Sequence, residues 1–179
     1  VHQAAAILES VAFRQPKNLR NNLVSSRLDT DVEGESGTTP CGSNHCHSCG
    51  IINRSNTLVG ANGYTYKVRD KFTCSSSNII YAISCKQCLD QIYVGETQQT
   101  LRGRMNGHRS DIRNHRHTPV SVHFNSPGHS IGDWQVMVLD QVRKCSKFSR
   151  LVAEQKFIDR FDSVRQGLNI DYNFVSHYR

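Results

Sequence analysis

Five of the seven cysteines stand at spacings that suit a metal ion. Cys85 and Cys88 form a C-x2-C pair, and Cys41, Cys46 and Cys49 form a C-x4-C-x2-C cluster. In a C-x2-C pair, two thiolates can reach one tetrahedral Zn²⁺ at about 2.3 Å each. Because an odd number of cysteines fits a disulfide framework poorly, we predict structural zinc at one or both of these places.

Each of these zinc ions needs further ligands. For the C-x2-C pair we expect His123 and His129, which are spaced H-x5-H in the loop HFNSPGH, where Pro and Gly can turn the chain back. For the upstream cluster, Cys74 is the expected fourth ligand, and His45 and His47 inside the cluster are the alternatives. Imidazole nitrogen and thiolate sulfur are both ligands that suit zinc.

The competing interpretation is that the cysteines are reduced, metal-free and buried as small apolar side chains. We expect that role for Cys145. A redox pair is the less favoured interpretation of Cys85 and Cys88, because no thioredoxin-like strand–helix–strand pattern surrounds them.

Apolar patterns predict the elements that position these residues. Strands are expected at 64–68, 79–83, 91–95 and 135–139. The second and third of them suggest an antiparallel hairpin whose loop carries Cys85 and Cys88. Helices are expected at 98–114 and 149–161, where apolar residues recur at helical spacing. This mixture predicts an α+β domain with a small three-stranded sheet, antiparallel or mixed, flanked by helices and preceded by a zinc-knuckle extension.

The first of these helices is strongly basic. Residues 98–117 hold five arginines against a single acid, Asp111. Four of the arginines are candidate DNA contacts: Arg102, Arg109, Arg113 and Arg116. Contacts of this kind bind phosphates, lose affinity as salt rises and carry little sequence information. The alternative interpretation is a charged helix face that only contacts solvent.

Composition and charge limit the class of protein. Of the 179 residues, 37% are hydrophobic and 21% are charged, which argues against a wholly disordered chain. Residues 1–40 hold four bases and five acids, which leaves 18 bases against 10 acids in the rest of the chain. Such a basic domain favours polyanionic partners, of which nucleic acid is the commonest. No run approaches the roughly 18 apolar residues of a membrane-spanning helix, so we expect no membrane partner.

The chain divides into segments of different amino-acid composition. We expect a helical connector with a polar linker (1–40), a cysteine-rich zinc knuckle (41–76) and an α+β domain (77–175). In the connector, one short helix is expected before Pro16 and another over 19–28, and 29–40 has the acidic, polar composition of a linker. The first residue is Val1 rather than Met, so we expect the chain to be a piece of a longer protein.

An ordered set of motifs resembles the GIY-YIG nuclease family. Ile79-Ile80-Tyr81 is followed, after eleven residues, by Tyr93-Val94-Gly95, which resembles the pair of motifs that names the family. Ile79 stands where the family has glycine, at an expected strand start where isoleucine need not be harmful. The remaining family positions follow in the expected order: Arg104, His108, Glu154 and Asn169.

A narrower resemblance concerns the surroundings of these motifs. The cysteine pair between the two tyrosine motifs and the run YVGETQQTLRGRMNGHRSDI are similar to the endonuclease of Penelope-like retroelements. The Cys41 cluster and the upstream stretch FRQPKNLRNNLV are similar to the connector between reverse transcriptase and endonuclease in those elements.

These residue types suit phosphodiester hydrolysis. Arg104 and His108 are four residues apart and share a helix face, and a guanidinium offers a fork of donors to a phosphate. Glu154 is a hard oxygen ligand of the kind that Mg²⁺ takes. The resemblance implies that Tyr81 or Tyr93 removes the proton from water, although its pKa must first be lowered from about 10. His108 is the competing general base.

The resemblance also implies supporting roles and partners. Asn169 is expected to hydrogen-bond within the site, and the cofactor is expected to be Mg²⁺ or Mn²⁺. The implied activity is a DNA nick whose 3′-hydroxyl primes reverse transcription of a retroelement. The partners would be DNA, the reverse transcriptase part of the same polypeptide and its template RNA, in the nucleus. The alternatives are a zinc-stabilised nucleic-acid-binding module without cleavage activity and a purely structural connector within a larger polymerase.

Overall fold

The computed structural model describes residues 36–88, 90–143 and 146–170. These residues belong to one compact unit, which spans Glu35–Arg179. The two helices expected before residue 29 and the role expected of Cys145 lie outside the described residues.

A three-stranded antiparallel sheet forms the centre of the fold. Its strands are β5 (Ile79–Cys85), β6 (Ile92–Thr97) and β7 (Trp134–Gln141), in the order β6-β5-β7. The hairpin of β5 and β6 is confirmed, and its register places Tyr81 opposite Gly95. β5 is buried almost throughout, because it lies between the other two strands. The predicted α+β class is therefore confirmed.

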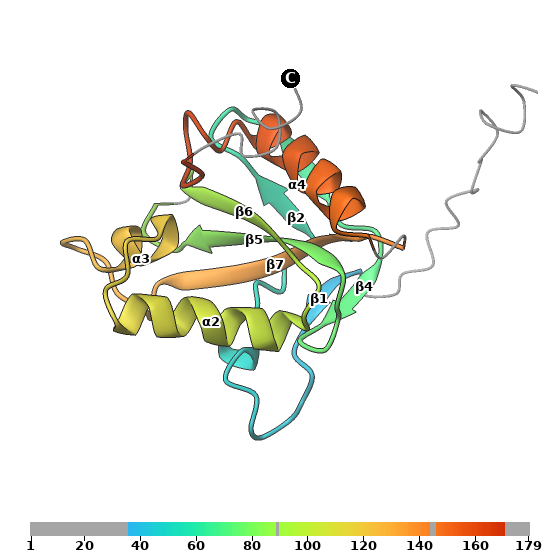
Figure 1. Ribbon diagram of the computed structural model, residues 1–179, viewed down its shortest axis with the longest axis horizontal. Helices are drawn as coiled ribbons and strands as arrows, with labels where there is room; N and C mark the ends of the chain where they lie inside the picture. Colours follow the sequence, from blue (N-terminus) through green and yellow to red (C-terminus); the bar gives the residue numbers. More distant parts are fainter. Residues whose placement is uncertain (1–35, 89, 144–145, 171–179) are drawn as a thin grey trace, which may run out of the picture. The chain divides into compact units, whose positions relative to one another are not determined.

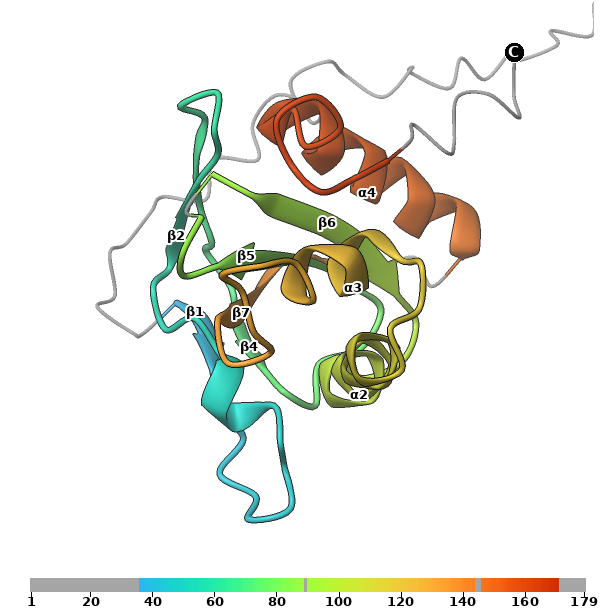
Figure 2. The ribbon, with the colours of Figure 1, turned by 90° about the vertical axis from the view of Figure 1, so that its left-hand side faces the viewer.

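Three helices accompany the sheet: α2 (Leu101–Arg113), α3 (Pro119–Phe124) and α4 (Lys147–Phe161). The hydroxyls of Thr100 and Ser146 accept hydrogen bonds from backbone N–H groups in the first turns of α2 and α4, so these residues set where the helices begin. In both ribbon views β6 lies between α2 and α4 (Figures 1 and 2). Both helices can therefore present side chains toward the end of this strand.

The cysteine-rich region adds short strands on the N-terminal side. β1 (Gly37–Thr39) pairs in parallel with β4 (Lys71–Thr73), and β2 (Thr57–Val59) forms an antiparallel hairpin with β3 (Thr65–Lys67). A 3₁₀ turn, η1, covers Cys49–Ile51. The prediction that 29–40 is linker throughout was wrong at its end, because 37–39 find a strand partner that is distant in the sequence.

The cysteine-rich region and the sheet share one hydrophobic core. The Thr38 hydroxyl accepts a hydrogen bond from the backbone N–H of Val138 at 2.8 Å, and Ile52 forms an isolated bridge to Val136. A movement of the cysteine-rich region would therefore disturb these contacts with β7.

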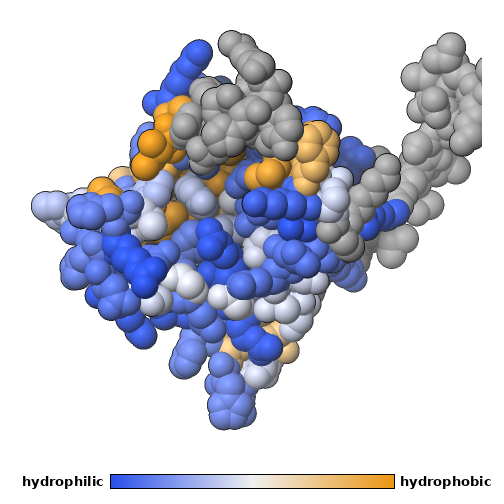
Figure 3. Space-filling view, viewed as in Figure 1, coloured by the Kyte–Doolittle hydropathy of each residue, from blue (hydrophilic) through white to orange (hydrophobic). Residues whose placement is uncertain are grey.

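The surface over α2 is mainly hydrophilic in the view of Figure 3, in keeping with the polar residues that this helix exposes. None of the helices in the described residues is long and apolar enough to cross a membrane.

Candidate active site and metal centres

Strand β5 and helix α2 bring Tyr81, Arg104 and His108 together. Arg104 Nε donates a hydrogen bond to the Tyr81 hydroxyl at 2.9 Å, and the same hydroxyl lies 2.8 Å from His108 Nε2. Tyr81 is fully buried, and His108 is only 3% exposed. Because Arg104 is one turn before His108 on α2, both side chains meet the same phenol.

Burial controls the charge of this group. Loss of solvent raises the pKa of Tyr81 well above its ordinary value, although Arg104 opposes the rise. Burial, aided by the positive charge of Arg104, lowers the pKa of His108 to about 3. Tyr81 and His108 are therefore both neutral near pH 7. The buried Nδ1 of His108 has no hydrogen-bond partner among the described residues.

Tyr93 completes an aromatic cluster beside them. Its ring centroid lies 5.7 Å from that of His108 and 6.4 Å from that of Tyr81. Unlike Tyr81, Tyr93 is partly exposed. Burial raises the pKa of Tyr93, Arg104 lowers it through its charge, and Glu154 raises it. Tyr93 is thus the phenol of the pair that solvent can reach.

Gly95 makes room for both phenols. A Cβ atom at this position would lie 2.6 Å from the Tyr81 hydroxyl oxygen and 2.8 Å from Cε1 of Tyr93. Since β5 places Tyr81 directly opposite Gly95, the two rings pass across the glycine. A side chain here would push the tyrosines away from Arg104 and His108, which explains the glycine in the second motif.

Helix α4 brings the carboxylate of Glu154 to the edge of β6 that faces away from β5. Glu154 Oε1 accepts a hydrogen bond from the backbone N–H of Glu96 at 3.0 Å. Burial and the neighbouring Glu96 raise the pKa of Glu154 to about 7, while that hydrogen bond and the positive charge of Arg104 lower it. The charges of Arg104 and Glu154 also act on each other's neighbours: Arg104 lowers the pKa of Glu154, and Glu154 raises the pKa of Tyr93.

A buried ion pair that the sequence reasoning missed supports this carboxylate. Arg150 is 3% exposed, and its Nε donates to Glu96 Oε2 at 2.7 Å. Arg150 also donates to the side-chain oxygens of Asn78 and Gln98. The sequence held no local signal for this pair, because its two residues are 54 positions apart. The ion pair ties the start of α4 to the end of β6.

Asn169 acts on the backbone of β6. Its Nδ2 donates to the Val94 carbonyl, and its Oδ1 accepts from the Val94 N–H, both at 2.9 Å. Ser163 donates a further hydrogen bond to the same Oδ1 at 2.8 Å. Together with Glu154 on the Glu96 N–H, Asn169 occupies the outer edge of the strand that carries Tyr93. The hydrogen bonds expected of Asn169 are thus made to the backbone of Val94, the middle residue of the second motif.

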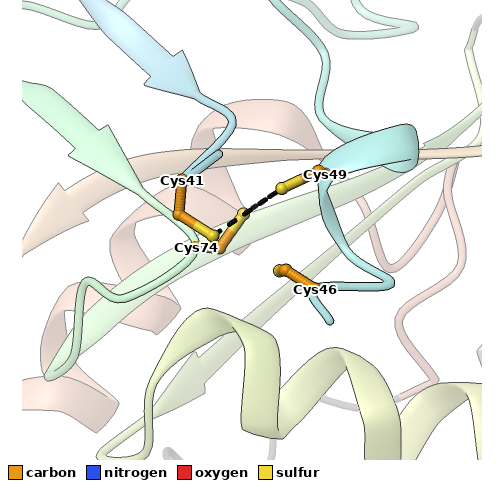
Figure 4. Close-up of side chains that lie close together, drawn as sticks. All are labelled: Cys41, Cys46, Cys49 and Cys74. Carbon is orange, nitrogen blue, oxygen red and sulfur yellow. Dashed lines mark hydrogen bonds between the residues drawn. The ribbon is translucent and has the colours of Figure 1, made fainter. Parts of the chain in front are cut away.

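The first cysteine cluster converges as a tetrahedral metal site requires. The sulfurs of Cys41, Cys46, Cys49 and Cys74 all lie within 4.8 Å of one another (Figure 4). Cys49 Sγ is 3.7 Å from the sulfur of Cys41 and 3.8 Å from that of Cys74. Four thiolates at 2.3 Å from one zinc ion would be about 3.8 Å apart. The geometry therefore fits an all-cysteine zinc site, with Cys74 rather than a histidine as the fourth ligand.

The second cluster combines two thiols with two imidazoles. The ligand atoms of Cys85, Cys88, His123 and His129 also lie within 4.8 Å of one another. His123 Nε2 is buried and has no hydrogen-bond partner among the described residues, which is what a missing metal ligand bond would leave. The expected loop position of His123 was wrong. It lies in the last turn of α3, which begins because Thr118 caps it and Pro119 stands in its first turn.

The four candidate DNA-contacting arginines differ in their surroundings. The Arg109 guanidinium donates a hydrogen bond to the His47 carbonyl at 2.9 Å and lies over the Trp134 ring. Its contacts are therefore with other residues of the protein. Arg113 is exposed at the end of α2, and Arg102 is half-buried on that helix. Arg116 follows α2 and forms an exposed ion pair with Asp111 at 3.5 Å.

A comparison with protein families agrees with this geometry. The family described as GIY-YIG catalytic domain matches residues 77–169, which is more than half of the chain. The chain belongs to the GIY-YIG family. Neither the curated proteins nor the solved structures give a significant match. Nuclease activity, and DNA as its substrate, are what membership of the GIY-YIG family implies in general.

Proposed function

We propose that the chain is a Mg²⁺-dependent DNA endonuclease that nicks its target. The observation that carries this proposal is geometric: Arg104 and His108 meet on the Tyr81 hydroxyl, the Tyr93 ring of β6 lies 5.7 Å from that of His108, and the Glu154 carboxylate is hydrogen-bonded to Glu96 on the same strand. Phosphodiester hydrolysis needs an activated water, donors for the phosphate oxygens and charge stabilisation at the leaving oxygen. Each need has a side chain of suitable chemistry here.

Tyr93 is the proposed proton acceptor for the attacking water. A general base must reach the water within hydrogen-bond distance. Tyr81 has no exposed surface, and its hydroxyl already contacts Arg104 and His108. Tyr93 is partly exposed, and the charge of Arg104 favours its phenolate. In this assignment Tyr81 positions the guanidinium and the imidazole rather than reacting.

Arg104 is the proposed phosphate ligand. Its Nε–H is fixed on Tyr81, and a guanidinium has four further N–H donors in a planar fork. A guanidinium anchored in this way presents its remaining donors with little loss of rotamer freedom.

Glu154 is the proposed ligand for the divalent cation. Its carboxylate is a hard oxygen donor, and its pKa of about 7 makes it available in ionised form near neutral pH. Bound there, Mg²⁺ or Mn²⁺ would stabilise negative charge on the phosphate and the leaving 3′ oxygen. The backbone N–H of Glu96 orients the carboxylate.

Zinc is proposed as the structural metal of both clusters. The ligand sets are those of closed structural sites, with four protein ligands each. One cluster joins the β5–β6 hairpin to α3 and the segment after it, and the other joins strand β4 to the upstream segment.

The wider role is proposed from the sequence resemblance to Penelope-like retroelements. The cysteine pair between the two tyrosine motifs and the upstream cysteine cluster support it. In that role the nick exposes a 3′-hydroxyl for target-primed reverse transcription in the nucleus. The partners are the reverse transcriptase part of the same polypeptide and its template RNA.

The proposed activity is tested by nicking of supercoiled plasmid in Mg²⁺. Removing one charge-stabilising donor from an active site lowers the rate about 10²–10³-fold, so Arg104→Ala is expected to lose at least this much. Glu154→Ala removes the proposed metal ligand and is expected to lose at least as much, because the charge stabilisation by the metal goes with it. Gln155→Ala, on the same helix as Glu154, is the matched control. If the Arg104 and Glu154 variants nick like the control, the site is assigned wrongly. If the wild type binds DNA in a salt-dependent manner without cutting it, the chain is a binding module.

A further inference from the structure

An open depression lies beside the active site, between the first turns of α2 and α4. It has a volume of about 550 Å³. Its lining comes from the end of β6 and the turn that follows, from α2 and from α4: Glu96, Thr97, Gln98, Gln99, Arg104, Lys147 and Arg150. Figure 1 shows the beginnings of both helices near the end of β6. Arg104 belongs both to this depression and to the Tyr81–His108 group, so the two are continuous.

The charges of the lining leave the depression positive. Its single acid, Glu96, is neutralised at 2.7 Å by Arg150, whose side chain is only 4% exposed. Two cations of the lining remain, Arg104 and Lys147. Lys147 is exposed, and no carboxylate lies within ion-pair distance of it in the part of the chain that the structure describes. An anion in the depression would therefore meet two positive side chains, one from α2 and one from α4.

The neutral residues of the lining suit phosphate oxygens. The Gln98 side-chain oxygen faces Arg150, which leaves its amide N–H groups as donors. Gln98 and Gln99 are both exposed at the turn between β6 and α2. Lysine ammonium and side-chain amides are groups that commonly contact DNA phosphates, and such contacts position the strand without reading its sequence.

We propose that this depression binds a DNA phosphate next to the one that is cleaved, with Lys147 as its cationic ligand and the Gln98 and Gln99 amides as donors. The proposal rests on the proposed nuclease function, because Arg104 is taken to hold the phosphate that reacts. Lys147 binds substrate here and takes no part in the chemical step. The sequence motifs of the family gave no signal for this residue, since it lies seven residues before Glu154 in no recognised pattern.

The test is equilibrium binding of the full chain to a short fluorescent DNA duplex over a series of salt concentrations, with Mg²⁺ and Mn²⁺ omitted so that no cutting occurs. Loss of one phosphate contact reduces the slope of log K against log salt by about one. Lys147→Ala is expected to show this change, and Lys147→Arg is expected to restore most of it. Lys156→Ala, an exposed lysine of the same helix outside the depression, is the matched control and is expected to keep the wild-type slope.

A second arm locates the phosphate. Once wild-type protein in Mg²⁺ has mapped the position that is nicked on this duplex, a single neutral methylphosphonate next to it should weaken binding by wild type more than binding by Lys147→Ala, because the variant no longer uses that charge. Equal slopes for Lys147→Ala and Lys156→Ala, or equal methylphosphonate effects in wild type and Lys147→Ala, would overturn the proposal. Failure of the nuclease function would appear separately, as wild-type protein that leaves plasmid uncut in Mg²⁺.

Discussion

Arg104 Nε and the Tyr81 hydroxyl are joined by a hydrogen bond of 2.9 Å inside the protein. The bond links the first motif, on β5, to the arginine of α2. Because Tyr81 is fully buried while Tyr93 is partly exposed, the two tyrosines that define the family motifs have different surroundings. We therefore expect removal of the hydroxyl to have different effects on stability and activity at the two positions.

Tyr81→Phe should mainly affect stability and the placement of Arg104. The change leaves the Arg104 Nε–H and His108 Nε2 without their partner, which costs about 1–3 kcal/mol of unfolding free energy. Tyr93→Phe should leave the unfolding free energy nearly unchanged and lower nicking by about 10²–10⁴-fold, as expected for loss of a general base. Urea unfolding and plasmid nicking measure the two effects. If Tyr81→Phe spares stability and Tyr93→Phe spares activity, the two roles have been assigned to the wrong residues.

His108 should make the protein less stable as the pH falls. Folding keeps the imidazole neutral, because its pKa is about 3 in the folded protein, whereas the unfolded chain takes up a proton below about pH 6.5. The stability is complete above that pH and is lost progressively toward pH 3. The groups that face the imidazole are Arg104, Tyr81 and Tyr93, and none of them changes charge in this range.

The comparison that isolates this effect is wild type against His108→Gln, whose amide can still hydrogen-bond to Tyr81. Between about pH 7.5 and pH 5, wild type should lose about 2 kcal/mol more unfolding free energy than the variant. All other titrating groups are common to both proteins. Parallel stability curves for the two would show that His108 is not held neutral by the fold.

Substitution of Arg109 and substitution of Arg113 should affect different properties of the protein, although the two residues stand one turn apart on α2. Arg109→Ala removes the contact with the His47 carbonyl, next to Cys46 in the first cluster, and is expected to speed zinc release to a chelator while the salt slope of DNA binding stays the same. Arg113→Ala removes an exposed charge and should reduce that slope by about one. A reduced slope for Arg109→Ala with no change in zinc release would place this guanidinium on DNA instead.

Two zinc ions per chain are expected in natively purified protein, one for each four-ligand group. Metal analysis of Cys85→Ser should show one ion fewer and a lower folded yield, because structural zinc contributes folding free energy directly. Ser84→Ala, at the neighbouring position, should keep both ions. Purified protein that is folded and contains no zinc would contradict both metal centres.

Patterns in the sequence predicted the strands and helices that are long enough to show a repeating spacing of apolar residues. The strands at β5, β6 and β7 and the helices α2 and α4 all carry runs or spacings of apolar residues that the buried positions of the structure explain. The converging ligands of both clusters were predictable from cysteine and histidine spacing. The ordered motif set predicted the GIY-YIG family, which the match over residues 77–169 confirms.

What the sequence could not show depends on contacts between distant residues. β1 and β4 have three residues each and exist through their mutual pairing, and α3 has six. No local pattern reveals that Arg150 is buried on Glu96, or that Arg109 lies over Trp134. Arg109 was predicted to contact DNA, and Arg150 was not singled out at all, because the partners of both lie far away in the sequence.

Metal-dependent nicking by full-length wild type and Glu154→Gln tests the central claim most directly. The wild type should convert supercoiled plasmid to open circles in Mg²⁺ and should not do so when Mg²⁺ and Mn²⁺ are omitted. Glu154→Gln removes the negative charge but keeps an acceptor for the Glu96 N–H, so it should fold normally and nick at least about 1,000-fold more slowly. Nicking by Glu154→Gln at the wild-type rate, or wild-type nicking that persists without Mg²⁺ or Mn²⁺, would contradict a metal-dependent endonuclease built around this carboxylate.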